Sequence, residues 1–236
     1  MILGIVVGLA LIQSWFGVGT LLLGTPLLLV LGVGYSEVLW TLLPCSLTVS
    51  VLQVLIDRRV SNSAVRGVFT YAVPMLLVGI AVSFLSSVRP RLGLIIAGML
   101  TLSAILRLSP TVAARVQQVA SRNESVILAM IGLVHGMTNM GGSLLLQLAT
   151  ALHRDKLDIR QHVAVSYAIL ALAQLVVLGV STGNGLRLET LWMAAAAGAT
   201  FLVLGRVSFN ALNQRFYNAV LSSFMLAIAA LLVWQA

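Results

Sequence analysis

Apolar residues along this chain fall into ten segments, arranged as two sets of five. The first set covers residues 2–14, 18–32, 38–56, 66–87 and 92–108, and the second covers 125–138, 141–152, 161–180, 188–205 and 214–235. A helix needs about 20 residues to cross a bilayer, so the first two segments of each set are too short to cross alone, and we take the other six as spans. The pattern predicts an all-α polytopic membrane protein with two inverted repeats, residues 1–108 and 125–236. Each repeat is a broken, re-entrant helix pair followed by three transmembrane helices.

A short polar segment, residues 109–124, separates the two repeats. Its valines share one helical face and its polar side chains another, with Val112, Val116 and Val119 set against Arg115, Gln118 and Arg122. An amphipathic helix lying on a membrane surface has this pattern. A plain linker accounts for the segment equally well, so the sequence leaves both interpretations open.

The composition places nearly the whole chain in a membrane. Hydrophobic residues make up 60% of it and charged residues 8%, against roughly 25% charge in a soluble domain. This leaves no room for a soluble catalytic domain, so we expect no enzyme activity, no cofactor and no metal. The net charge of +8 would suggest nucleic acid as the partner of a soluble protein. In a membrane protein it indicates basic loops on one side, and no nucleic-acid partner is expected.

Lys and Arg counts on the connections distinguish two topologies. If each broken pair crosses the membrane once, each side carries seven basic residues. If each pair enters and leaves on the same side, one side carries only Arg89, Arg91 and Arg187. The other side then carries Arg58, Arg59, Arg66, Arg107, Arg115, Arg122, Arg154, Lys156, Arg160, Arg206 and Arg215. The positive-inside rule favours the second topology, which gives the repeats opposite orientations and places both termini in the periplasm.

Two small-residue elements interrupt apolar runs at corresponding places, residues 12–20 and 133–143. Such paired interruptions are the best sequence indication of a substrate site in a secondary transporter. Helix N-termini at the breaks would expose N–H groups and a positive dipole end, which bind small anions. The residues expected to form these helix starts are Gly17, Gly19, Thr20, Asn139, Gly141, Gly142 and Ser143. If the glycines only allow close helix packing, no such site exists.

Further polar side chains inside the apolar segments are candidate ligands of the same anion. They are Gln13 and Trp15 before the first break, His135 and Thr138 before the second, Ser46 and Gln53 in segment 38–56, and Ser166 and Tyr167 in segment 161–180. Serine and threonine hydroxyls in membrane helices often bond only their own backbone, which is the competing interpretation for each of them. His135 could couple transport to protons, or it could be a neutral donor that fixes the turn.

The two halves resemble the repeat of the TauE/SafE-type anion exporters, in the toluene-sulfonate uptake permease superfamily. The resemblance is carried by residues 16–21, 25–27 and 42–47 in the first half and by 135–143 and 162–167 in the second. The usual run of three or four consecutive glycines is missing from both halves, and no proline in the second half matches Pro26. The resemblance implies transport of sulfite, sulfonates or related organic anions across a bacterial inner membrane.

These observations predict a secondary transporter for a small anion that works by alternating access. An anion channel with the same site and a non-transporting membrane subunit are the alternatives. The expected partners are the anion and the lipid bilayer. Proton coupling and a homodimer are left open by the sequence.

Overall fold

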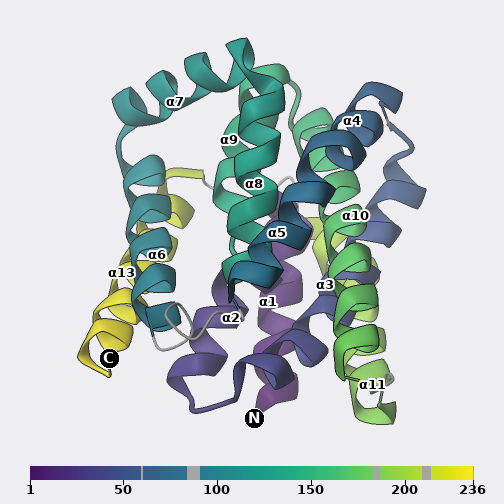
Figure 1. Ribbon diagram of the computed structural model, residues 1–236. Helices are drawn as coiled ribbons and strands as arrows, with labels where there is room; N and C mark the ends of the chain where they lie inside the picture. Colours follow the sequence, from purple (N-terminus) through teal and green to yellow (C-terminus); the bar gives the residue numbers. More distant parts are fainter. Residues whose placement is uncertain (60, 84–90, 183–186, 209–213, 236) are drawn as a thin grey trace.

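Every element of the computed structural model is a helix over the part of the chain that it describes, residues 1–59, 61–83, 91–182, 187–208 and 214–235 (Figure 1). The predicted all-α membrane fold is therefore confirmed. The inverted relation of the two halves and the domain limits remain predictions.

The first half begins with two short helices and continues with longer ones. These are α1 (Ile2–Phe16), α2 (Thr20–Val30), α3 (Tyr35–Asp57), the continuous run of α4 (Asn62–Gly67), the π-helical turn η1 (Val68–Ala72) and α5 (Val73–Ser83), and then α6 (Leu92–Leu108). The helical run that the sequence placed at 66–87 begins at Asn62, four residues earlier. Its residues 84–87, together with Arg89, lie outside the described residues.

The second half repeats this order of short and long helices. It contains α8 (Glu124–Thr138), α9 (Gly142–Leu152), α10 (Lys156–Thr182), the run of α11 (Leu188–Thr200), η3 (Phe201–Gly205) and α12 (Arg206–Ser208), and α13 (Gln214–Trp234). Among the described residues, four helices are long and apolar enough to cross a membrane: α3, α4–α5, α10 and α11–α12. The expected span at 92–108 is 17 residues long and becomes a fifth candidate only together with the next helix, α7 (Pro110–Arg122).

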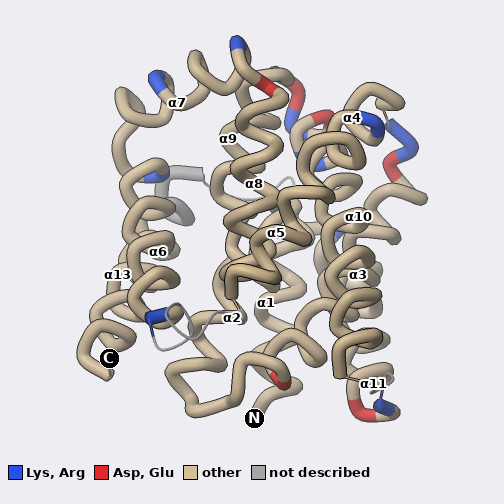
Figure 2. Tube along the Cα trace, viewed as in Figure 1, with Lys and Arg blue, Asp and Glu red and all other residues tan. Residues whose placement is uncertain are grey.

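The two short pairs open toward opposite ends of the molecule. Both termini and the outer ends of α1 and α2 lie at the lower end in Figure 1, whereas α8 and α9 open at the upper end, next to α7. Basic residues gather mainly at the upper end in Figure 2, around α4, α7 and the connection between α9 and α10. We call this the basic end and the other the opposite end. The distribution agrees with the charge bias on which the predicted topology depends.

Helix α7 (Pro110–Arg122) forms in the segment between the two halves and meets α6 at 104°. Ser109 Oγ caps it by accepting a hydrogen bond from Val112 N at 3.4 Å. The helix packs against α9, where Gln117 Nε2 donates to Gln147 Oε1 at 2.8 Å. The segment is therefore a helix. Its place on a membrane surface remains a prediction.

Glycines bring α8 into backbone contact with η1 and α5. A side chain at Gly132 would overlap the carbonyl of Ala72, and one at Gly136 would overlap the carbonyl of Leu76. Small residues at such crossings allow membrane helices to approach closely. This contact fixes α8, whose C-terminal end leads into the second break, against the helix run from α4 to α5.

Candidate functional site

The first predicted break is present between α1 and α2. Gly17 ends α1 in the left-handed conformation, with φ 72°, and its N–H donates to Gln13 O at 2.8 Å. Helix α2 then begins at Thr20. A Cβ atom on Gly19 would lie 2.7 Å from Ile12 Cγ2 and 2.8 Å from Gln13 N. The close return of the chain onto α1 therefore requires glycine at this position.

The second break has the same construction between α8 and α9. Asn139 ends α8 with φ 63°, and α9 begins at Gly142. Thr138 Oγ1 bridges the break, since it accepts a hydrogen bond from Met140 N at 3.2 Å. A Cβ atom on Gly141 would lie 2.8 Å from Ile131 O. Both apolar runs are therefore interrupted where the sequence indicated.

Each break leaves a helix start without a side-chain cap. The first helical hydrogen bonds come from Leu23 N to Gly19 O at 2.9 Å and from Leu145 N to Gly141 O at 3.0 Å. The three amides that precede each of these donors have no partner within their own helix. The buried hydroxyls of Thr20 and Ser143 also lack a hydrogen-bond partner among the residues described. Each start thus combines oriented amides with one hydroxyl that can donate.

Two glutamines fasten the first break to α3. Gln13 Nε2 donates to Ser46 O at 3.1 Å and to Ser50 Oγ at 3.0 Å. Gln53 Nε2 donates to Gln13 O at 3.2 Å and to Ser14 O at 3.3 Å. The donors of both glutamines are thus engaged, whereas the Ser46 hydroxyl has no hydrogen-bond partner among the described residues and can donate to an anion. The glutamines act on the backbone of α1 and fix the shape of the break.

An aromatic pair borders the second break. The rings of His135 and Tyr167 meet edge to face, with centroids 5.6 Å apart. In the part of the chain that the structure describes, neither ring nitrogen of His135 nor the Tyr167 hydroxyl has a hydrogen-bond partner, although both side chains are fully buried. The Tyr167 hydroxyl lies against Gly142, where any side chain would overlap it. With Ser143, these groups place potential donors around the start of α9.

Three predicted site residues use their polar hydrogens elsewhere. Trp15 Nε1 donates to Ser208 Oγ at 2.7 Å, Thr138 Oγ1 to Val134 O at 2.7 Å, and Ser166 Oγ to His162 O at 2.8 Å. Bonds of the last two kinds are the ordinary backbone bonds of threonine and serine in membrane helices. These contacts support the helices in this conformation.

Hydrogen bonds between the halves connect the two breaks. Asn139 Nδ2 donates to Thr25 Oγ1 of α2 at 2.9 Å. Tyr35, the first residue of α3, donates its hydroxyl hydrogen to Met137 O near the end of α8 at 3.2 Å. Tyr35 was not among the predicted site residues, because nothing local in the sequence relates it to a carbonyl 102 residues away.

A buried arginine was also missed. Arg160 donates from Nε and Nη2 to Asp57 Oδ2, at 3.1 and 2.6 Å, and from Nη1 to Ser14 O at 3.3 Å. Counting both charges as loop residues concealed this contact. The sequence offered one indication of it: Asp57 ends a long apolar segment, where an unpaired charge would be costly, so a cationic partner could have been expected.

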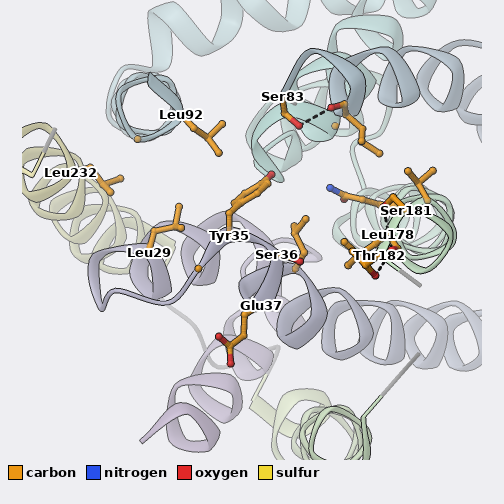
Figure 3. A pocket seen from close by; sticks show the side chains of 17 residues that line it. Leu29, Tyr35, Ser36, Glu37, Ser83, Leu92, Leu178, Ser181, Thr182 and Leu232 are labelled. Atoms are coloured by element: carbon orange, nitrogen blue, oxygen red, sulfur yellow. Dashed lines mark hydrogen bonds between the residues drawn. The ribbon is translucent and has the colours of Figure 1, made fainter. Parts of the chain in front are cut away.

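A cavity of about 620 Å³ opens at the opposite end, between the start of α3 and the end of α10 (Figure 3). Tyr35 points into it, with Leu29 on one side and Leu178 on the other. Gln174, which is buried and has no partner for Oε1, also lines it. The cavity reaches Gly136, three residues before Asn139. It therefore approaches the second break from the end that carries few basic residues.

This fold and site define a multi-pass membrane protein with the paired broken helices of secondary transporters. The chain belongs to the sulfite exporter TauE/SafE family, whose family model matches residues 1–232. The members of this family are membrane transporters and not enzymes. Neither curated proteins nor solved structures gave a match. Among the residues that the structure describes, no group of three or more His, Cys, Asp or Glu side chains could hold a metal ion.

Proposed function

We propose that the protein is a secondary transporter that moves a small organosulfur or related organic anion, such as sulfite or a sulfonate, across the bacterial inner membrane by alternating access. The observation that carries this proposal is the pair of uncapped helix starts, each with a buried hydroxyl that has no partner. They occur in a chain that belongs to a transporter family for anions.

The anion is held by the first amides of α2 and α9 and by the hydroxyls of Thr20 and Ser143. A helix start attracts an anion through its dipole and its free N–H groups, so the site needs no Lys or Arg. Ser46, His135 and Tyr167 supply further donors around it. Gly17, Gly19, Gly141 and Gly142 allow the chain to turn and to pack closely at the breaks, while Gln13, Gln53 and Asn139 hold the turns in place.

In the membrane, the basic end faces the cytoplasm and both termini face the periplasm, because Lys and Arg are retained on the cytoplasmic side. His135 couples transport to protons through its two ring nitrogens, which have no hydrogen-bond partner among the described residues. A homodimer is compatible with this arrangement, and neither the site nor the topology depends on it.

Flux measurements on the purified chain in liposomes test the proposal. Sulfite, thiosulfate, short sulfonates and short carboxylates are offered one at a time. A carrier shows saturation and counterflow for at least one of them. A current that rises linearly with voltage would instead make the protein a channel, and no flux with any of these anions would make it a non-transporting subunit.

A further inference from the structure

The buried ion pair between Asp57 and Arg160 joins the two halves at the basic end. The two side chains are only 11% and 6% exposed. Within the described part of the chain, the other ion pairs run from Arg59 to Asp155 and Asp158, and these side chains are largely exposed. Asp57 is the last residue of α3, and Arg160 lies in the second turn of α10.

The same arginine holds the first break. Its Nη1 donates to Ser14 O, in the last turn of α1, where carbonyls have no partner within the helix. Gly17 also packs against this part of α10, because a Cβ atom there would lie 2.9 Å from Val163 Cγ1. A movement of the first turns of α10 must therefore disturb the break as well as the ion pair.

Helices α3 and α10 are joined at the basic end and separated at the opposite end. The large cavity is lined by Tyr35 and Leu39 of α3 and by Gln174 and Leu178 of α10. At the basic end, a smaller cavity of about 230 Å³ lies beside the ion pair and is lined by Val165, among others. Of these two cavities, the larger thus lies at the opposite end.

A buried ion pair is a suitable contact for a two-state movement. Desolvation offsets much of the attraction between its charges, so the pair adds little net stability, although removing one partner is costly. We propose that the Asp57–Arg160 ion pair is the gate that closes the anion site toward the basic end, and that it opens when α3 and α10 close the cavity at the opposite end. This inference rests on the proposed function, since a gate requires cargo that passes it.

Reciprocal cysteine labelling tests the gate. Val165→Cys reports on the smaller cavity and Gln174→Cys on the larger one, each in a Cys45→Ser background that removes the chain's one native cysteine. The full chain is reconstituted in liposomes with a charged maleimide on both sides. Asp57→Asn should raise labelling at Val165→Cys about tenfold and lower it at Gln174→Cys, since a minor state populated at roughly 0.1–10% leaves room for such a shift.

Arg59→Gln is the matched control. It removes two exposed ion pairs at the same end, those from Arg59 to Asp155 and to Asp158. Its labelling at Gln174→Cys should equal that of the parent, and the comparison is made at this position because Arg59 itself lines the smaller cavity. Arg160→Lys provides a second test if Asp57→Asn does not fold, because lysine keeps the charge but loses the fork that reaches Asp57 and Ser14 together.

Labelling that rises at both cysteines, or changes at neither, overturns the gate. The measurement uses no substrate, so its result does not depend on finding the cargo. A chain that moves none of the anions tested would reject the proposed function, whereas the reciprocal change in labelling decides the gate separately.

Discussion

Asn139 Nδ2 donates a 2.9 Å hydrogen bond to Thr25 Oγ1, which lies 114 residues earlier in the chain. Both residues are fully buried. Asn139 ends α8 with a positive φ, and Thr25 lies within α2, the helix that follows the first break. Asn139 therefore both ends the helix before the second break and attaches that break to α2, the helix that follows the first break. A movement of one break should therefore displace the other.

The first prediction concerns this hydrogen bond. Thr25→Val leaves the amide of Asn139 buried without an acceptor, which should lower stability by about 1–3 kcal/mol. Asn139→Gly keeps the positive φ and removes the amide. The double variant should then be no less stable than Thr25→Val alone, because the unpaired donor is gone. Thermal unfolding in detergent measures this, with Thr101→Val as control, since that hydroxyl bonds only Ala97 O of its own helix. Additive losses would contradict the coupling.

A second prediction concerns the hydroxyls at the helix starts. Thr20→Val and Ser143→Ala should each raise the KM for the transported anion about tenfold or more, since a hydrogen bond to a charged group contributes about 1.5–3 kcal/mol. Thr150→Ala changes a hydroxyl on α9 that bonds Leu146 O and should leave KM unchanged. If both site variants keep the parental KM, the anion does not bind at these helix starts.

The third prediction uses the contact between Gly142 and Tyr167. Gly142→Ala should reduce transport strongly, because the new methyl group would overlap the tyrosine hydroxyl. Tyr167→Phe in the same chain removes that oxygen and should restore part of the stability, since the ring carbon Cζ would still lie 2.8 Å from the methyl position. Flux and thermal stability are compared in the two variants. If Tyr167→Phe fails to improve stability in the Gly142→Ala chain, this packing argument is wrong.

A fourth prediction tests proton coupling. His135→Gln keeps a neutral polar side chain of similar reach but cannot take up a proton. If His135 carries the coupling proton, an imposed pH gradient should accelerate anion flux in the parent and have no effect in the variant. His153→Gln, which changes a histidine at the basic end, should behave like the parent. Acceleration that persists in His135→Gln would assign coupling to another group.

The sequence predicted the breaks well because they are local events. Gly17 and Asn139 can adopt a positive φ, and Gly19 and Gly141 tolerate the close return of the chain, so small residues within an apolar run mark both places. The helix starts at Thr20 and Gly142 follow from the same pattern. Helix bounds differed by several residues in places, since the runs expected to start at 66 and 161 begin at Asn62 and Lys156.

The contacts that hold these breaks were harder to predict because they depend on tertiary packing. Arg160 looks like a loop cation in the sequence, and only the approach of α3 and α10 brings it to Asp57 and Ser14. Tyr35 and Met137 are likewise brought together by packing alone. Conversely, Ser166 was a candidate ligand, but its hydroxyl donates to His162 O of its own helix. The residue type alone does not show which of these two partners a buried serine takes.

The contact of Gly132 and Gly136 with the carbonyls of Ala72 and Leu76 has a mechanical consequence. Two helices whose main chains touch at successive turns have no layer of side chains between them that could slide. We therefore expect α5 and α8 to move together as one rigid unit. A displacement of the second break should then also move the helix run from α4 to α5, which is packed against α8.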